Sequence, residues 1–101
     1  MNYAISMDFE IIISPRASFE IDKALSWYSA KETHLGLELL DEINTEFKLL
    51  SSNPFLFPET KKKYREVPLR RFPYIIIYRI FRNDILIQSV FNTHQNPIKK
   101  P

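Results

Sequence analysis

Four stretches of the chain are predicted to be β-strands, the first of them because its apolar and polar residues alternate. In residues 7–13, MDFEIII, the side chains of Phe9, Ile11 and Ile13 fall on one side and acidic side chains on the other, which is the period of two of a half-buried strand. The other three stretches lie in the second half of the chain, at residues 64–69, 74–81 and 85–91. The sequence RND between the last two is typical of a turn, so we expect these three strands to form an antiparallel meander.

Between the first strand and the others, apolar residues recur at spacings of three and four, which predicts two helices. The first helix is expected to begin at Pro15, because proline lacks the N–H that would be unpaired at the first helical position. Ser14 precedes it and can cap the helix by accepting a hydrogen bond from a free amide. The apolar stripe predicted to face the core consists of Ala17, Ile21, Ala24, Leu25 and Tyr28.

The second helix is expected to start with Thr33 as its cap, and prolines in the segment SSNPFLFPE are expected to end it. Its stripe is formed by Gly36, Leu40, Ile43, Phe47 and Leu50, with Leu39 on the same side. The connection between the helices is expected to be the segment SAKE, residues 29–32. So short a connection favours an antiparallel helical hairpin.

The strand at residues 74–81, YIIIYRIF, is apolar on both sides and is interrupted only by Arg79. Burying each isoleucine contributes roughly 1.5 to 3 kcal/mol, whereas an exposed ion pair contributes at most about 1 kcal/mol. We therefore expect this strand to be central in the sheet, with the charges that flank it at the surface. The partner of the first strand stays open.

The predicted fold class is α+β: an N-terminal strand, then an antiparallel two-helix hairpin packed on a largely antiparallel sheet that ends in a three-strand meander. The length of 101 residues predicts a single domain over residues 1–101. The absence of cysteine excludes disulfides and thiolate metal sites, and with only His34 and His94 we expect no metal. Gly36 is the only glycine, so a glycine-rich phosphate loop is excluded and we expect no cofactor.

No apolar run approaches the roughly 20 residues that span a bilayer, and no signal peptide is recognisable, so we expect a cytoplasmic protein that does not bind membranes. Charge is divided along the chain. Residues 1–60 hold four Lys and Arg against ten Asp and Glu, a balance of −6, whereas residues 61–101 hold ten against two, a balance of +8. Either the second half presents a cationic surface to an acidic partner, or the two halves neutralise each other in the fold.

Several short motifs occur in the same order as these elements: ISPRA at the first helix, LSWYSAK before the second, the Asn53-Pro54 break, RFPYIIIY in the central strand, and Val90, Phe91, His94 and Pro97 in and after the last strand. The set, which runs from Phe9 to Pro97, resembles the RelE/ParE superfamily of bacterial toxins from type II toxin-antitoxin systems. The resemblance implies a compact α+β toxin that inhibits an essential macromolecule and is neutralised by a cognate antitoxin wrapped around it.

Within that superfamily, RelE-like members cleave messenger RNA on the ribosome and ParE-like members poison DNA gyrase. Many cleaving members have an arginine directly after the first tyrosine of the central strand, and here that position is Ile75. Because an isoleucine cannot stabilise a phosphorane, we favour the ParE-like subgroup and no enzymatic activity. The alternatives are a ribosome-dependent endoribonuclease and a non-toxic module that only binds an antitoxin.

For the nuclease alternative, the candidate catalytic residues are Arg65, Arg71 and His94. His94 has an unperturbed pKa of roughly 6.5 and can act as acid or base near neutral pH. The competing interpretation, which we favour, is that its ring only tethers the C-terminal tail by hydrogen bonds. Arg65 and Arg71 would have to converge from neighbouring strands to replace the arginine that is missing at position 75.

The candidate partner-binding residues are cationic or aromatic: Lys61, Lys62, Lys63, Arg70, Arg79, Trp27 and Tyr28. The lysine run can meet an acidic antitoxin tail, although such runs are usually solvated loops. Trp27 and Tyr28 can bind an antitoxin helix or a second copy of the chain, although such aromatics are more often core. Arg70 and Arg71 are adjacent, so we expect at most one to reach a given pocket and the other to pair with a helix carboxylate.

Overall fold

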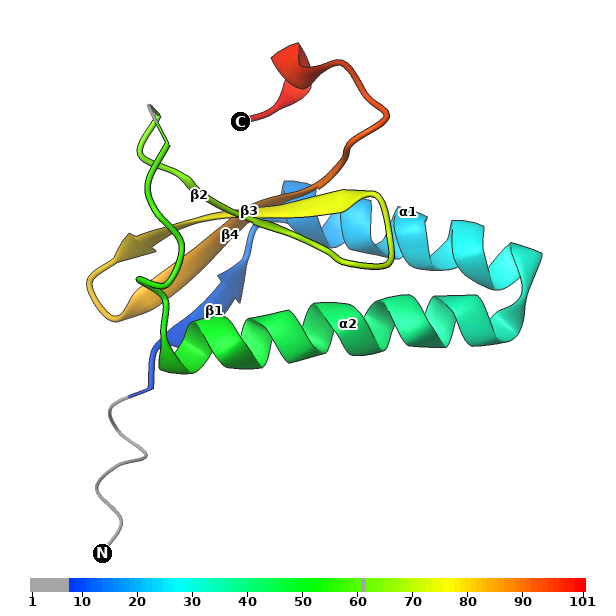
Figure 1. The fold of residues 1–101 in the computed structure, drawn as a ribbon, viewed down its shortest axis with the longest axis horizontal. Coiled ribbons are helices and arrows are strands. Elements are labelled where there is room, and N and C mark those ends of the chain that lie inside the picture. The colour runs from blue at the N-terminus through cyan, green and yellow to red at the C-terminus, as the bar shows by residue number, and fades with distance from the viewer. Residues whose placement is uncertain (1–7, 61) are drawn as a thin grey trace, which may run out of the picture.

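The computed structural model describes residues 8–60 and 62–101, and shows a helical hairpin on one face of a four-stranded sheet (Figure 1). The C-terminal segment lies on the opposite side of the sheet from the helices (Figure 1). In chain order the elements are β1 (Glu10–Ile13), α1 (Pro15–Lys31), α2 (Thr33–Ser52), β2 (Arg65–Pro68), β3 (Tyr74–Phe81), β4 (Asp84–Asn92) and the short 3-10 helix η2 (Pro97–Lys99). The predicted α+β fold is confirmed.

The strand order in the sheet is β1-β4-β3-β2, so β3 lies in the interior of the sheet as its sequence predicts. β2, β3 and β4 form the expected antiparallel meander, and β1 joins β4 in parallel. The loop between β3 and β4 is shorter than predicted, because Asp84 pairs with Phe81 and leaves only Arg82 and Asn83 in the turn. The predicted first residue of β1, Met7, lies outside the described residues.

α1 begins where the sequence predicts. The Ser14 hydroxyl accepts a hydrogen bond from the Ala17 N–H at 3.0 Å, and Pro15 occupies the first turn. The predicted stripe faces the core, with Ala17 and Ala24 buried and the larger members packed against the buried cluster.

The connection between the helices differs from the prediction. α1 continues to Lys31, so most of the SAKE segment is helical and Glu32 alone joins the two helices. Thr33 is the first helical residue of α2 and not its cap; Glu32 holds the cap position, without a side-chain hydrogen bond. One extended residue is enough because Glu32 serves at once as the C-cap of α1 and the N-cap of α2.

The core stripe of α2 is shifted slightly from the predicted one. Leu39, Ile43 and Leu50 are buried, whereas Leu40, which the sequence places in the stripe, is 37% exposed. On a helical projection Leu39 lies beside Leu50 within the face of buried residues, whereas Leu40 falls beyond Gly36 at the edge of that face. Gly36 is buried where α2 crosses α1.

β4 carries one extra residue, because Ile77 pairs with Ser89 but the next residue, Tyr78, pairs with Ile87. This bulge turns both Ile87 and Val90 toward the helices, where both are buried. Beyond the end of β1, side chains of α1 and its cap satisfy the edge of β4: Ser14 donates to the Gln88 carbonyl. The Glu20 carboxylate accepts from the Ser89 hydroxyl at 2.7 Å and from the Val90 N–H at 2.9 Å.

Residues 93–101 cross the outer face of the sheet, away from the helices (Figure 1). The contacts that hold this C-terminal segment include the Thr93 N–H, which donates to the Pro73 carbonyl at 2.9 Å, and Arg16 of α1, which donates to the Lys99 carbonyl. Lys100 pairs with Glu66 of β2 at 3.2 Å. Ile77 and Phe91, which face this side, are each 1% exposed. The segment therefore covers Ile77 on the second apolar side of β3, whereas Phe81 at the end of that side stays 51% exposed.

Within residues 8–60 and 62–101, no helix is long and apolar enough to cross a bilayer. The same ranges contain no group of three or more His, Cys, Asp or Glu side chains arranged to hold a metal ion.

Candidate partner-binding groove

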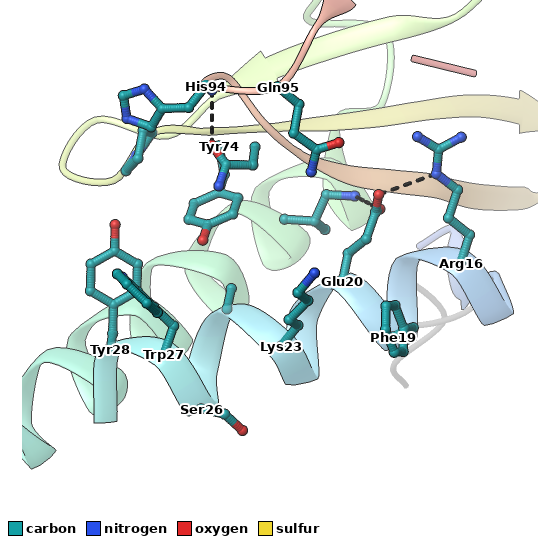
Figure 2. A pocket seen from close by; sticks show the side chains of 14 residues that line it. Arg16, Phe19, Glu20, Lys23, Ser26, Trp27, Tyr28, Tyr74, His94 and Gln95 are labelled. Carbon is teal, nitrogen blue, oxygen red and sulfur yellow. Dashed lines mark hydrogen bonds and ion pairs between the residues drawn. The ribbon is translucent and has the colours of Figure 1, made fainter. Parts of the chain in front are cut away.

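A groove of about 940 Å³ runs along α1 and is closed on its other side by the ends of β3 and β4 and the start of the C-terminal segment (Figure 2). We call it the α1 groove. Its floor is apolar and its rim is aromatic and cationic. The residues that line it include Phe19, Lys23, Trp27, Tyr28, Tyr74 and His94.

The floor is built from residues that the core fixes in place. Ala24 is 3% exposed and Val90 is 1% exposed. The Tyr28 ring packs edge-on against Phe72 at 5.0 Å and Tyr74 at 6.3 Å between ring centroids. Burial, and secondarily the nearby Tyr28, raises the pKa of the Tyr74 phenol, so this floor stays uncharged at neutral pH.

The α1 rim of the groove consists of Phe19, Lys23 and Trp27, spaced four residues apart and therefore aligned along one face of the helix (Figure 2). Phe19 is 65% exposed and Trp27 is 58% exposed, which is a large exposure for two aromatic side chains on one helix. Lysine ammonium groups lie over both rings, Lys23 at 5.9 Å from Phe19 and Lys31 at 4.3 Å from Trp27. The rim thus offers apolar area and positive charge together.

The opposite wall is formed by His94 and Gln95, which follow β4 (Figure 2). The His94 backbone N–H donates to the Asn92 side chain at 2.9 Å, which fixes the direction of the chain at the groove. Arg16 and Glu20 form the end of the groove and pair at 3.2 Å. Because Glu20 also binds the β4 backbone, the end wall is held rigidly.

Comparison with known proteins gives these features a context. Residues 11–97 match the family described as "ParE toxin of type II toxin-antitoxin system, parDE". The chain belongs to the ParE toxin family. It is a ParE-like toxin component of a type II toxin-antitoxin system, and the partner class of such a toxin is an antitoxin.

A solved structure is similar to this ParE toxin in fold. It is described as "Chromosomal ParDE TA system from P. aeruginosa", with a TM-score of 0.73 and 17% sequence identity over 85% of this chain and 97% of that chain. At this identity the likeness concerns the fold. The comparison with curated proteins gives no match.

The structure of the ParE toxin places the three candidate nuclease residues on separate elements. Arg65 of β2 donates to the Phe57 carbonyl and lies 5.3 Å from the Phe55 ring. Arg71 precedes β3 and pairs with Glu38 of α2. His94 follows β4 and lines the α1 groove.

The sheet register shows how far apart two of them are. Arg65 pairs with Tyr78, whereas Asn92, two residues before His94, pairs with Tyr74 four residues away along β3. Four residues of a strand span roughly 13 Å. Ile75, in the position where cleaving relatives are expected to have arginine, is half-buried and pairs with Phe91 and Pro68.

The candidate partner-binding cations fall outside the α1 groove. Lys62 and Lys63 are exposed in the loop before β2, and Lys61 lies outside the described residues. Arg70 and Arg71 lie in the bend between β2 and β3 and not on a strand, because the Glu42 carboxylate holds both of their backbone N–H groups. Arg71 makes the predicted pair with a helix carboxylate, and Arg79 is exposed on β3.

Of the two predicted aromatics, Trp27 lies on the exposed rim and Tyr28 in the floor of the α1 groove. Sequence analysis missed the other rim residues, Phe19 and Lys23. The spacing of Phe19, Lys23 and Trp27 is visible in the sequence, and a helical projection shows two aromatics outside the apolar stripe. That projection is the signal that identifies an exposed aromatic face.

Proposed function

We propose that this ParE toxin acts by binding DNA gyrase, without cleaving RNA, and that a cognate antitoxin neutralises it by occupying the α1 groove. The choice of binding over cleavage rests on the positions of Arg65 and His94, which the strand register separates by roughly 13 Å along β3, and on the pairing of Arg71 with Glu38. Cleavage of RNA through its 2′-hydroxyl requires a base, an acid and cationic donors within hydrogen-bond reach of one phosphate. Here two of the three groups are engaged in contacts with the toxin itself.

The target is tested by exposing two purified systems to the toxin. We expect gyrase to accumulate cleaved, protein-linked DNA in the presence of the toxin, and translating ribosomes to leave their messenger RNA intact. Codon-specific cleavage of the messenger RNA would instead identify the ribosome-dependent endonuclease. Induced expression without an antitoxin should arrest growth, and normal growth would identify a module that has lost toxicity.

The α1 groove supports the antitoxin site because its chemistry fits an amphipathic segment with acidic flanks. Apolar side chains of such a segment would contact the floor at Ala24 and Tyr28, and its carboxylates would face Lys23 and Lys31. Exposed aromatic area of this kind is where alanine scanning usually finds the largest losses of binding energy, often 2 kcal/mol or more. The groove thus accounts for exposed aromatics that the fold does not need.

The antitoxin site is tested with Trp27→Ala and with Phe81→Ala as a matched control, since Phe81 is 51% exposed but lies on β3 away from the groove. We expect Trp27→Ala to weaken antitoxin binding about 30-fold or more, mainly through faster dissociation. Phe81→Ala should change the affinity less than about threefold. Equal effects of the two substitutions would exclude the α1 groove as the antitoxin site.

A further inference from the structure

Within residues 8–60 and 62–101, the outer edge of β1 is an open sheet edge with unpaired backbone groups. The N–H of Glu10 donates to the Asn83 carbonyl and the N–H of Ser14 donates to the Ile87 carbonyl, so the even-numbered residues of this segment point toward β4. The odd-numbered residues point the other way. Phe9 is satisfied there by Ser51 of α2, through its N–H and its carbonyl, which leaves the outward groups of Ile11 and Ile13 without a partner in residues 8–60 and 62–101.

Side chains add to the openness of this edge. β1 has only four residues, and two of them are exposed isoleucines: Ile12 is 45% exposed and Ile13 is 42% exposed. A sheet edge with unpaired donors and exposed apolar side chains is a template for another strand. The β1 edge therefore has the features of a surface that is covered in an assembly.

The other edge of the sheet is protected. Glu59 forms an antiparallel bridge with Arg65 of β2, and the Thr60 N–H donates to the Tyr64 carbonyl, so the preceding loop folds over part of this edge. β2 ends at Pro68, which has no N–H to donate. Of the two edges of the sheet, the β1 edge is therefore the one open to another strand within the described residues.

A second groove, of about 560 Å³, lies beside the open edge between β1 and α2. Ile11 and Phe47 provide its apolar part, and the α2 side carries Asp41, Asn44 and Lys48. None of these residues lines the α1 groove. A partner at the β1 edge and an antitoxin in the α1 groove would thus use different residues.

We propose that the β1 edge is the interface between two copies of this chain. A two-fold axis through Ile12 would pair Ile11 of one copy with Ile13 of its partner, so that every outward N–H and carbonyl of both residues is satisfied in an antiparallel ladder. The same axis reverses the direction of α2. An antiparallel pair of α2 helices centred between Asn44 and Thr45 places Asp41 of each copy opposite Lys48 of the other.

This charge pattern favours a second copy over an unrelated strand. Asp41 and Lys48 are seven residues apart, too far along the helix for an i,i+4 pair with each other, and they are equidistant from the centre of the face. Self-complementary charge around a two-fold axis is what an isologous interface requires. The proposal commits to a homodimer and does not depend on the cellular target of the toxin.

The geometry is tested by disulfide crosslinking, which is clean because the natural chain has no cysteine. Residues facing each other across an antiparallel pair of this kind have Cα atoms about 4.5 Å apart, within the range of a disulfide. We expect Ile12→Cys to form an intermolecular disulfide in most molecules under mild oxidation. Ile98→Cys is the matched control, because Ile98 is 81% exposed and would crosslink more readily if random collision were the cause. Equal or greater crosslinking of Ile98→Cys would overturn the proposal.

Charge exchange provides the second test, by sedimentation velocity from about 1 µM to about 300 µM. Asp41→Lys and Lys48→Asp each introduce two like-charge contacts across the axis, so each should weaken the dimer about tenfold, and the double variant should restore it. A natural chain that stays monomeric throughout this range would overturn the proposal. A double variant no tighter than the single variants would also overturn it.

Discussion

At Gly36 the two helices approach so closely that no side chain fits between them. A Cβ atom built at this position would lie 1.9 Å from the Ser29 hydroxyl oxygen and 3.3 Å from the Leu25 carbonyl oxygen. Glycine normally costs about 1 kcal/mol relative to alanine inside a helix. Here it permits the contact on which the hairpin of α1 and α2 depends, so its role is close packing and not a special backbone angle.

We expect Gly36→Ala to lower the free energy of unfolding by about 1 kcal/mol, because the steric cost exceeds the gain in helix propensity. Helix propensity alone would raise the free energy of unfolding by a similar amount. Urea unfolding measures this change. The double variant Ser29→Ala/Gly36→Ala removes the hydroxyl and should recover part of the loss. A Gly36→Ala protein as stable as the natural chain would show that the helices separate at little cost.

Tyr78 is a second residue whose surroundings matter, because they make the stability of the fold depend on pH. Its side chain is fully buried, its hydroxyl donates to the Pro54 carbonyl at 2.7 Å, and burial raises its pKa from 10.0 to about 12, partly opposed by Arg65. Because the folded pKa exceeds the unfolded pKa, the neutral phenol stabilises the fold fully below pH 10 and progressively less as the pH rises toward 12.

We expect Tyr78→Phe to cost about 1 to 2 kcal/mol at pH 8, since the buried Pro54 carbonyl loses its donor. Between pH 10 and 12 the natural chain should lose on the order of 2 kcal/mol more than the variant, because only the natural chain must bury the ionising phenol. Urea unfolding at several pH values tests both statements. Parallel stability curves over this interval would contradict the assignment of the pKa.

At the scale of elements, β4 depends on α1 as much as on its neighbouring strands. β1 pairs with β4 only as far as Ile87, and a bulge follows at once. Glu20 and Ser14 then take the place of the missing strand by bonding the β4 backbone. Helix α1 therefore has two roles: it forms the end wall of the α1 groove and it satisfies the edge of β4.

We expect Glu20→Ala to lower the free energy of unfolding by about 2 to 3 kcal/mol, because it leaves the Val90 N–H and the buried Ser89 hydroxyl without an acceptor. Glu20→Gln keeps one acceptor oxygen and should cost less than about 1 kcal/mol. Thermal and urea unfolding of the two variants give the comparison. Equal losses in both would indicate that the Arg16 ion pair, and not the strand edge, accounts for the effect of Glu20.

At the scale of the whole molecule, the acidic first half and the basic second half neutralise each other only in part. Glu38 of α2 pairs with Arg71 of the second half, and Glu42 accepts hydrogen bonds from the backbone N–H groups of Arg70 and Arg71. Glu66 and Lys100, which also pair, both belong to the second half. In contrast, Lys62, Lys63, Arg79 and Arg82 are exposed and form no ion pair within the described part of the chain. The same structure thus contains an ion pair between the two halves and a set of exposed cations in the second half.

If the lysine run contacts the antitoxin, replacing Lys61, Lys62 and Lys63 with alanine should slow association about tenfold at low salt and much less at high salt, with little effect on dissociation. Stopped-flow mixing at two ionic strengths measures this. The comparison with Trp27→Ala, expected to act on dissociation, separates electrostatic steering from contact in the groove. Unchanged association at low salt would remove the lysines from the antitoxin interface.

The candidate site was only partly accessible from the sequence. Trp27 and Tyr28 were identified because aromatic side chains on a helix are a local feature, and they do lie in one groove. His94 reaches the same groove because β4 extends to Asn92 and brings the start of the C-terminal segment to the side of the groove opposite α1. The separation of Arg65, Arg71 and His94 depends on the sheet register and on carbonyl and carboxylate partners, none of which leaves a periodic pattern in the sequence.

By itself, the sequence determined the helices, the central position of β3 and the start of α1 at Pro15 after its cap Ser14, because each follows from local periodicity, capping or the apolar character of neighbouring residues. Only the tertiary structure decided that β1 pairs in parallel with β4, that Leu39 and not Leu40 enters the core, that Glu32 alone joins the helices, and which charges are paired. These features depend on contacts between segments far apart in the chain. The residues next to a given position in the sequence do not indicate which distant segment that position will contact.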